Sequence, residues 1–447
     1  MEKGIDNMHF RKNETFELNG QTVKILDLLG EGGQGEVYLV SYSGNKYAFK
    51  YYKDIPDSDF RYNLRNNITK GSPSKDFLWP KEFIEFTDDT CGYFMDLRPK
   101  NYVSFISYLT GKNKFKDTST MLKWCIDLVL NFKLLHEKGY SYQDLNDGSF
   151  FLDKDTGDIL ICDNDNVTAD KKSLGVLGKM RYMAPEIVRG DKDRLSGDRQ
   201  MPDTHSDRFS LAIILFLTMC LGNPFEGERL KKYVIVDENA EKEMFGDNPI
   251  YVYNENDKSN RPIRGYHTAV LNRYPNLPPY IKKAFHKTFV DGLKDRENSR
   301  TTELEWLKLL TRYRDELITC SKCGRQYPYG FDEKKHNDHC LYCKAKTKRF
   351  CFIQIGKSRV VLEPGKYLYE FHVDKYSSNY SLPVMKVVVN KNKPDLWGIK
   401  LNLKNDVEVK DKKDMTKIIA KDGVIPIVNG LKIKFNENVI AQIICEN

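Results

Sequence analysis

The chain has 447 residues, and its 71 basic and 63 acidic side chains give a net charge of +8 at neutral pH. This length exceeds what one ordinary hydrophobic core accommodates, so we expect two or three domains, and a 40% hydrophobic content excludes a largely disordered chain. The small positive excess favours solubility over nucleic-acid binding. No apolar signal segment opens the sequence, and the longest apolar run, Leu211 to Leu221, is too short to cross a bilayer. The sequence therefore predicts a cytoplasmic protein that does not contact membranes.

The N-terminal part of the sequence predicts a β-rich unit. Residues 1–15 are polar and are expected to be flexible. After them, the runs VKILDLL, EVYLVSY and KYAFKYY are rich in β-branched and aromatic residues, which is typical of strands. Residues 58–70 repeat apolar side chains at every fourth position and predict a helix that ends at Gly71. A further apolar run, residues 91–97, is expected to be a buried strand.

The middle of the sequence predicts mainly helices. Residues 120–140 place apolar side chains on one helical face, and Gly139 is the expected stop signal. The runs FFLD and ILIC flank the turn KDTG, which predicts a hairpin. Helical patterns dominate residues 204–316, and short β-type runs return from residue 348. We therefore expect a β-rich lobe, a helical lobe, a cysteine-rich segment and a β-rich module, in that order.

A glycine-rich segment, GEGGQGEV, lies between the first two predicted strands. Gly30, Gly32 and Gly35 leave its backbone bare, so that amide groups can approach phosphate oxygens. A strand follows these glycines, whereas a dinucleotide site of the Rossmann type requires a helix there. On the next strand, Lys50 of YAFK carries an ammonium group that can hold phosphates. Taken singly, the two features are equally compatible with a structural hairpin and an exposed strand lysine.

Four more motifs follow along the chain. They are YQDLNDGSF directly after the long helix, ICDND after the hairpin, RYMAPEIV, and HSDRFSLAIILF at the start of a buried helix. Together with the glycine hairpin and the lysine, their order and spacing resemble the protein kinase superfamily over about residues 16–316. More closely, the chain resembles a bacterial Ser/Thr protein kinase-like family. The strings ICDNDNV and DFLWP resemble a group within it that has a C-terminal zinc ribbon and is often associated with PP2C-type phosphatases.

This resemblance implies an α+β, bilobal protein kinase-like fold. The N-lobe would cover residues 16–98 and the C-lobe residues 99–316. Glu186 of the APE motif would form a buried ion pair with Arg300, and Asp207 would brace the catalytic loop from below. The implied partners are a protein substrate and, through the C-terminal modules, a PP2C-type phosphatase or another protein.

The resemblance also implies ATP and Mg²⁺ (or Mn²⁺) as cofactors. Lys50 would hold the α- and β-phosphates, Asp144 would accept the proton of the substrate hydroxyl, and Asp163 would bind the metal. The implied reaction is transfer of the γ-phosphate of ATP to Ser or Thr hydroxyls. The other residues implied to contact nucleotide or metal are Gly30, Gly32, Gly35, Val37, Met95, Asp96, Leu97 and Ser149.

The sequence departs from the family pattern at several positions. Ser149 stands where the family has an asparagine that binds the second metal, and Asn164 replaces the phenylalanine of the DFG motif. Asp165 adds a carboxylate near the metal site, which could partly make up for the change at position 149. Lys179 replaces the activation-segment threonine, and no glutamate lies within residues 51–80, so the usual helical partner of the strand lysine is missing.

These departures leave three functional hypotheses open. The intact Lys50, Asp144 and Asp163 favour an active Ser/Thr protein kinase. Ser149 and the missing glutamate favour a nucleotide-binding pseudokinase scaffold, in which the C-terminal modules bind partners. The missing activation-segment threonine leaves a kinase that acts on a small molecule or nucleotide as the third hypothesis.

Ten cysteines without a signal segment favour a reducing compartment. Four of them form two CxxC pairs separated by sixteen residues, which predicts a structural zinc ribbon within residues 317–347. The alternative is four unrelated buried cysteines, and either His336 or His339 could replace one cysteine ligand. The predicted zinc ligands are Cys320, Cys323, Cys340 and Cys343. The remaining cysteines, at positions 91, 125, 162, 220, 351 and 445, are expected to be core residues.

Residues 348–447 alternate apolar and polar positions in six or more short runs. This pattern predicts a small all-β, sandwich-like domain. The spacing loosely resembles a forkhead-associated domain, a phosphothreonine reader, with GLKIKF as the best match, but the Gly-Arg and Ser-x-x-His motifs of that family are absent. We therefore expect a partner-binding module without assigning a ligand to it.

Overall fold

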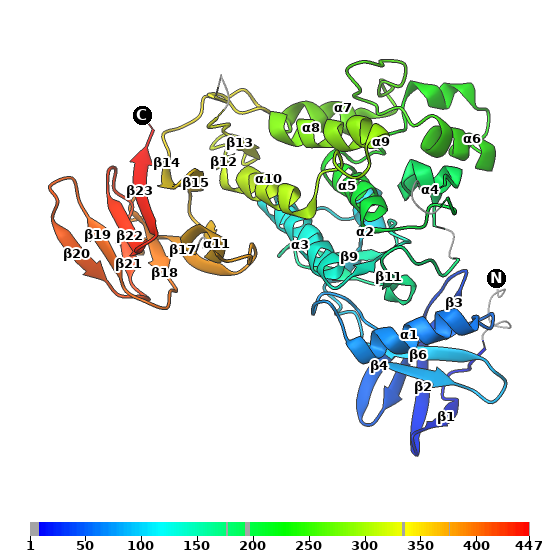
Figure 1. The fold of residues 1–447 in the computed structure, drawn as a ribbon. Coiled ribbons are helices and arrows are strands. Elements are labelled where there is room, and N and C mark those ends of the chain that lie inside the picture. The colour runs from blue at the N-terminus through cyan, green and yellow to red at the C-terminus, as the bar shows by residue number, and fades with distance from the viewer. Residues whose placement is uncertain (1–8, 176–177, 193–196, 333–335, 375, 447) are drawn as a thin grey trace.

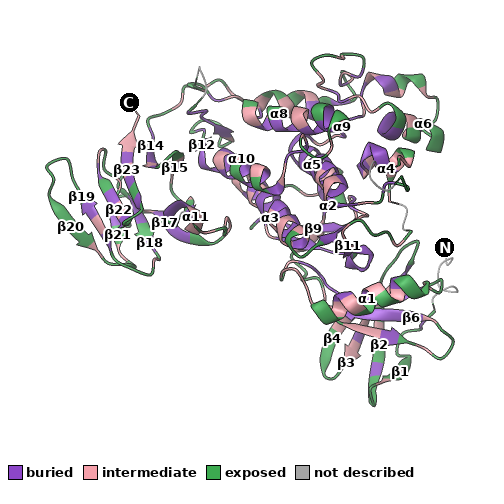
Figure 2. Ribbon diagram, in the orientation of Figure 1, coloured by how far each residue is buried: buried purple, intermediate pink, exposed green. Residues whose placement is uncertain are grey.

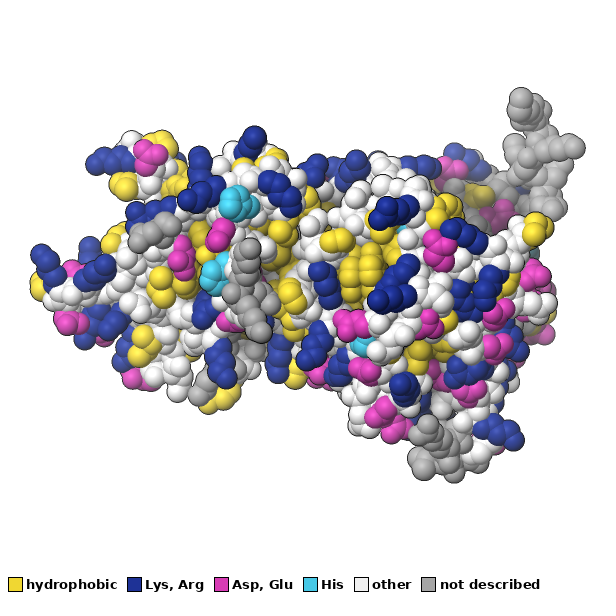
Figure 3. Space-filling model, turned by 90° about the horizontal axis from the view of Figure 1, so that it is seen from above, with side chains coloured by type: hydrophobic (Ala, Val, Ile, Leu, Met, Phe, Trp, Pro, Cys, Tyr) yellow, Lys and Arg dark blue, Asp and Glu magenta, His cyan; other side chains and the backbone are white. Residues whose placement is uncertain are grey.

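The computed structural model describes residues 9–446 except 176–177, 193–196, 333–335 and 375. Figure 1 shows an N-terminal sheet, a helical part, and a β-rich C-terminal part beside the helices. No helix among the described residues is long and apolar enough to span a membrane. On the face seen in Figure 3, basic and acidic side chains are interspersed, as expected for a small excess of positive charge.

The N-terminal sheet has six antiparallel strands in the order β1-β2-β3-β4-β6-β5. The predicted helix is α1 (Ser58–Lys70), with the expected bounds. The side chain of Asp57 caps α1 by accepting a hydrogen bond from the Phe60 amide, and Gly71 follows its end with a φ of 74°. The strands, which include the predicted β-rich runs, are β1 (Thr15–Leu18), β2 (Gln21–Glu31), β3 (Gly35–Tyr42), β4 (Asn45–Tyr52), β5 (Glu82–Glu85) and β6 (Cys91–Met95).

Residues 9–14 pack against this sheet, which corrects the expectation that the whole N-terminal segment is flexible. The Phe10 ring is only 7% exposed and lies among the aromatic side chains of the sheet. The His9 ring stacks on Tyr51 with centroids 4.0 Å apart, and the His9 amide donates a hydrogen bond to the buried Glu36 side chain. One aromatic side chain can anchor a polar segment because it buries a large apolar area. The first eight residues of that segment lie outside the described part of the chain.

The helical part is built around α5 (Thr204–Cys220), almost all of whose residues are buried (Figure 2). The longest apolar run is therefore a core helix, as predicted. The other long helix, α3 (Thr118–Glu137), matches the clearest predicted helix, and Gly139 follows its end with a φ of 76°. The expected hairpin is formed by β9 (Phe150–Asp153) and β10 (Ile159–Ile161). The remaining helices and strands are α2 (Phe105–Leu109), α4 (Pro185–Arg189), α6 (Glu238–Lys242), α7 (Thr268–Arg273), α8 (Pro279–His286), α9 (Gly292–Lys294), α10 (Glu303–Asp315), β7 (Tyr102–Ser104), β8 (Tyr140–Ser141) and β11 (Thr168–Ala169).

After α10 the described residues form short strands and one helical turn. In the cysteine-rich segment, β12 (Leu317–Thr319) pairs with β13 (Gln326–Pro328). The C-terminal part consists of a six-stranded and a four-stranded antiparallel sheet that share one apolar core. The six-stranded sheet contains, in spatial order, β15 (Ser358–Leu362), β14 (Cys351–Ile355), β23 (Val439–Cys445), β22 (Lys432–Asn436), β19 (Val407–Lys410) and β20 (Thr416–Ile419). The four-stranded sheet contains β16 (Tyr367–Tyr369), β17 (Pro383–Val389), β18 (Trp397–Leu401) and β21 (Val424–Pro426), with α11 (Glu370–Val373) between β16 and β17.

Two cysteines that were expected to be core thiols are bonded to each other. Cys351 and Cys445 form a disulfide between β14 and β23, where they lie directly opposite one another in the strand register. The pairing joins the two ends of the C-terminal part, and spacing along the sequence gives no sign of it. The other four cysteines outside the CxxC pairs are buried free thiols, as expected: Cys91, Cys125, Cys162 and Cys220.

The C-terminal part docks on α10 and α3 through polar contacts. The amide of Tyr369 donates to Nδ1 of His372, so Nε2 carries the proton and donates to Asp315 at 2.9 Å. The guanidinium of Arg314 stacks on the Tyr369 ring at 3.6 Å. On α3, Asp127 accepts a hydrogen bond from the hydroxyl of Ser381. Several buried polar groups would lose their partners if these surfaces separated, so the two parts are joined by more than the connecting chain.

Glu186 and Arg300 form the buried ion pair that the sequence predicted. The two guanidinium nitrogens of Arg300 lie 2.8 and 2.7 Å from the two carboxylate oxygens of Glu186. Arg296 adds a third contact to Glu186 at 3.1 Å. Burial alone would raise the pKa of Glu186, but the two arginines lower it to about 2. The pair fixes α4 against the loop that precedes α10.

We expect the variant Arg300→Met to lower the free energy of unfolding by about 3 kcal/mol, because it leaves the Glu186 carboxylate buried with only Arg296 beside it. Urea unfolding followed by tryptophan fluorescence measures this loss. Lys154→Met is the matched control, since Lys154 pairs with Asp155 at an exposed surface and its removal should not change the midpoint. Equal midpoints for the two variants would contradict the structural role of the pair.

Candidate active site

Lys50 on β4 and Asp165 in the ICDND motif connect the sheet to the helical part. Nζ of Lys50 lies 2.6 Å from Oδ2 of Asp165 and 3.4 Å from the side-chain oxygen of Gln34. The hydroxyl of Tyr52 donates to the same oxygen of Asp165 at 2.5 Å. Lys50 is 7% exposed and Asp165 is fully buried. Burial alone would lower the pKa of Lys50, but the carboxylates of Asp165 and Asp163 raise it, so the ammonium group stays charged.

Asp163 and Asp144 interact electrostatically with this pair. Burial raises the pKa of Asp163; the charge of Lys50 opposes this rise, and the carboxylates of Asp165 and Asp144 add to it. Asp163 has a left-handed backbone, with φ 55° and ψ 42°, which turns the chain out of β10. Burial also raises the pKa of Asp144, whose Oδ1 accepts a hydrogen bond from Asn146 at 3.0 Å. The three expected catalytic residues therefore belong to one electrostatic cluster.

The glycine-rich segment forms the turn between β2 and β3, beside Lys50. Gly30 lies opposite Val37 in the strand register, and Val37 lies opposite Lys50. The amide of Gly32 donates to the carbonyl of Gly35 at 2.9 Å, which closes the turn. Gly35 has no room for a side chain, because a Cβ atom there would collide with the backbone of β4. Residues 31–34 of the turn are exposed next to the buried lysine.

The residues expected at the adenine end of the site lie where β6 ends. Met95 is the last residue of β6 and lies opposite Ala48 on β4. Asp96 is exposed and forms an ion pair with Lys81 at 2.6 Å, whereas Leu97 is half-buried. The segment that follows Met95 has no strand partner, so its backbone groups are available to a ligand. Contact between these residues and adenine remains a prediction.

Two residues that depart from the family pattern are bonded within the protein. Ser149 is fully buried, and its hydroxyl accepts from the Asn146 amide and donates to the Asp144 carbonyl, each at 3.3 Å. Asn164 is also buried, and its amide nitrogen donates to the carbonyls of Leu78 and Ile161 at 3.0 and 2.9 Å. Polar side chains here replace apolar packing with hydrogen bonds. The metal-binding role of Ser149 remains a prediction.

Asp207 braces the catalytic loop as expected, because its carboxylate accepts a hydrogen bond from the Tyr142 amide at 2.7 Å. Gln143, the next residue, has a left-handed φ of 71°. The His136 ring lies between two carboxylates, with Nε2 3.0 Å from Asp207 and Nδ1 2.9 Å from Glu303. Burial alone would lower the pKa of His136, but hydrogen bonds to both carboxylates raise it to about 9. The sequence analysis did not identify this histidine.

Two charged residues have roles in the site that the sequence analysis missed. Asp165 was expected near the metal, which stays a prediction, and the structure in addition pairs it with Lys50. Lys179 was noted only as the replacement of a threonine, yet it forms an ion pair with Asp147 at 2.7 Å, and its charge partly opposes the rise that burial causes in the pKa of Asp144. The absence of a glutamate from residues 51–80 could have indicated this role of Asp165, because a buried Lys50 requires a carboxylate from some other segment.

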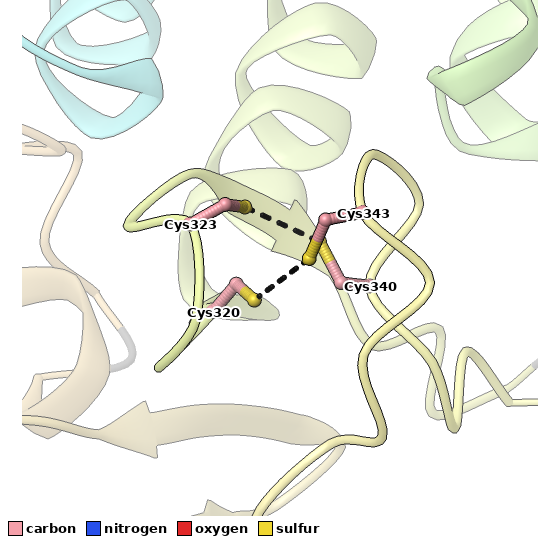
Figure 4. A group of neighbouring side chains, drawn as sticks. All are labelled: Cys320, Cys323, Cys340 and Cys343. Atoms are coloured by element: carbon pink, nitrogen blue, oxygen red, sulfur yellow. Dashed lines mark hydrogen bonds between the residues drawn. The ribbon is translucent and has the colours of Figure 1, made fainter.

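The four cysteines of the CxxC pairs converge at one point (Figure 4). Their sulfur atoms all lie within 4.8 Å of one another, with two separations of 3.5 and 3.7 Å. Four thiolates around zinc, with Zn–S bonds of about 2.3 Å, would have sulfur atoms about 3.8 Å apart, so the arrangement fits a tetrahedral ion. His336 instead contacts the Gly330 carbonyl at 3.2 Å and stacks on Tyr329.

The site combines a glycine-rich hairpin, a buried lysine and clustered aspartates. The model of the protein kinase domain family matches residues 23–302, which is more than half of the chain. The chain therefore belongs to the protein kinase domain family.

Curated relatives share this domain at low identity. The human ribosomal protein S6 kinase alpha-2 is 25% identical over 247 residues, which cover 52% of this chain and 31% of the relative. The serine/threonine-protein kinase Nek11 of Macaca fascicularis is 24% identical over 281 residues, 59% of this chain and 40% of the relative. The protein kinase C delta type of Rattus norvegicus is 24% identical over 216 residues, 45% of this chain and 29% of the relative. The chain thus spans well under half the length of these relatives.

His136 should make stability depend on pH in the alkaline range. Its pKa in the folded protein is raised above the ordinary value of 6.5, so its stabilising effect is complete below pH 6.5 and is lost as the pH rises through 9. The shift corresponds to about 3 kcal/mol. Urea unfolding at pH 6.5 and pH 9.5 should show this loss in the natural protein and a much smaller one in His136→Gln. The same alkaline loss in the variant would assign it to another group.

Proposed function

We propose that this protein is an ATP- and Mg²⁺-dependent protein kinase that transfers the γ-phosphate to Ser or Thr hydroxyls. The observation that carries the proposal is the buried pair of Lys50 and Asp165, with Asp163 and Asp144 electrostatically coupled to it. Asp165 is buried, whereas Asp144 is half-buried and Asp163 is exposed, so two carboxylates of the cluster are open to a ligand. Membership of the protein kinase domain family supports the same reaction.

Each group has a role that its surroundings support. Lys50 would hold the α- and β-phosphates, and the backbone amides of the glycine turn would approach the phosphate oxygens. Asp144 would orient the substrate hydroxyl and accept its proton, and burial has already raised its pKa toward that of a base that works near neutral pH. The segment from Met95 to Leu97 would bind adenine through its backbone.

The carboxylates of this site fit Mg²⁺, which prefers oxygen ligands. Asp163 would be its first ligand. Oδ1 of Asp165 is buried and has no hydrogen-bond partner, so it offers a second oxygen. When bound, the ion would neutralise charge on the phosphates. Mn²⁺ could take its place, and Ser149 would contribute only if its hydroxyl gave up a bond within the loop.

A nucleotide-binding pseudokinase scaffold is the second candidate. It is favoured by Ser149, whose hydroxyl is engaged by the backbone of the catalytic loop, and by the docking of the C-terminal part on α10. In that case residues 348–447 would bind a partner, for which a PP2C-type phosphatase is our proposal.

We place the protein in the cytoplasm and divide it into an N-lobe, a C-lobe, a zinc ribbon and a β-rich module, at the boundaries that the sequence predicts.

The proposed zinc ribbon predicts close to one zinc ion per chain by elemental analysis of the purified protein. The variant Cys323→Ser/Cys343→Ser should lose that zinc, because it removes two of four thiolate ligands. Cys351→Ser/Cys445→Ser is the matched control: it also replaces two cysteines but should keep the metal. Less than about half a zinc per chain in the natural protein would contradict the ribbon.

Phosphate transfer from γ-labelled ATP tests the catalytic proposal. Asp144→Ala and Asp163→Asn should each lower the rate of incorporation into protein at least about a hundredfold, since each removes a group needed at the reacting phosphate. Asp155→Asn, which changes an exposed aspartate in the β9–β10 turn, should keep the natural rate.

Two outcomes would change the proposed function. If the folded natural protein transfers no phosphate with Mg²⁺ or Mn²⁺ but still binds ATP, the scaffold function replaces the kinase. If the phosphate appears on small molecules rather than on Ser or Thr, the enzyme class stands and the substrate class is wrong.

A further inference from the structure

The buried ammonium group of Lys50 takes its counter-charge from the segment that leads into the activation loop. Lys50 Nζ lies 2.6 Å from Asp165, and the two groups are 115 residues apart in the sequence. Asp59, the acidic residue of α1, is exposed in the first turn of that helix. Helix α1 therefore supplies no carboxylate to the lysine.

We propose that Asp165 is the positioning residue of Lys50, and that nucleotide binding by this lysine does not depend on α1. The inference rests on the proposed function only in naming a nucleotide as the ligand of Lys50. Asp165 holds Lys50 and the Tyr52 hydroxyl with the same oxygen. Two donors from one strand fix the direction of the carboxylate, and the carboxylate then fixes the ammonium group.

Helix α1 is anchored by a different set of bonds. The side-chain amides of Asn63 and Asn67 both donate to the carbonyl of Val167, at 2.8 and 2.7 Å. The indole of Trp79 donates to the carbonyl of Asn67 at 3.0 Å. All three are neutral hydrogen bonds, and the two from the asparagines reach the backbone just after Asp165. The Phe60 ring of α1 also packs against Tyr52, with centroids 5.4 Å apart, but no hydrogen bond or ion pair of α1 reaches Lys50 or Asp165 among the described residues.

Lys50 is therefore oriented by one set of contacts and α1 is held in place by another, whereas a single glutamate on α1 could have done both. A glutamate on α1 would tie the orientation of Lys50 to the position of the helix. Here the lysine is tied to Asp165, two residues from the proposed metal ligand Asp163, so lysine and metal site share one short segment. Regulation through displacement of α1 would consequently have little effect on nucleotide affinity.

Calorimetric titration with ADP in the presence of EDTA measures the lysine contribution without metal. Asp165→Asn should weaken ADP binding about tenfold, because it replaces a charged partner of Lys50 with a neutral one. Lys50→Met should weaken ADP binding by a similar factor. The double variant Lys50→Met/Asp165→Asn should bind ADP as weakly as Lys50→Met alone and no more weakly. Additive losses would show that the two residues act separately, which would overturn the proposal.

Asn63→Ala tests the independence of α1. It removes one bond from the helix to Val167 and should change ADP affinity less than twofold. A loss as large as that of Asp165→Asn would overturn the proposal. Asn63 is partly exposed, so this test holds even if Asp165→Asn does not fold.

A chemical readout separates this inference from the proposed function. The rate of acetylation of Lys50 by acetic anhydride, followed by mass spectrometry, requires no nucleotide. Asp165→Asn should raise this rate, because burial without the carboxylate favours the neutral amine, whereas Asn63→Ala should leave it unchanged. If no nucleotide binds the natural protein, the proposed function fails, and the acetylation rates alone decide whether Asp165 positions Lys50. Equal rates in all three proteins would overturn the inference.

Discussion

An ammonium group that is withdrawn from water requires a negative charge beside it, and this requirement at Lys50 organises the centre of the molecule. Asp165 meets it, which places the ICDND segment against β4. Val167 then lies where two asparagines of α1 can reach its carbonyl. The sheet, the helix and the segment leading to the activation loop thus assemble around one ion pair.

The same pair leaves the site with an excess of negative charge. Asp144, Asp163 and Asp165 interact with one another and with Lys50, and Lys179 also acts on Asp144; burial raises the pKa of Asp144 and Asp163. A divalent cation would relieve this repulsion, and a phosphate ligand would bring such a cation with it. The excess of negative charge is what our proposal requires, in which a metal–nucleotide complex completes the site.

Features with a local cause could be predicted from the sequence. The helix at residues 58–70 has its own periodicity, cap and terminating glycine, and the structure has the same bounds. The pair of Glu186 and Arg300 and the brace from Asp207 join distant residues, and they could be predicted only through the resemblance to protein kinases. The partner of Lys50 could not be predicted in this way, because the local sequence around Asp165 indicates a metal site and says nothing about which distant side chain lies above it. The packing of Phe10 and the Cys351–Cys445 bond were missed for the same reason, since each depends on a surface or strand formed elsewhere in the chain.

A departure from a family motif is best judged by what the replacing side chain contacts. Asn164 cannot pack as an aromatic ring does, yet it donates two hydrogen bonds to backbone carbonyls that flank it. Ser149 shortens a side chain, yet it closes the catalytic loop by bonding to residues 144 and 146. Asp165 pairs with Lys50 in place of the missing glutamate of α1. Lys179, which replaces the activation-segment threonine, pairs with Asp147. Each of these changes brings a polar partner to the replacing side chain, although one side-chain oxygen of Asn164 and one of Asp165 are buried without a hydrogen-bond partner. The new contacts show that the site is built around these residues, which is what our proposal of a kinase requires.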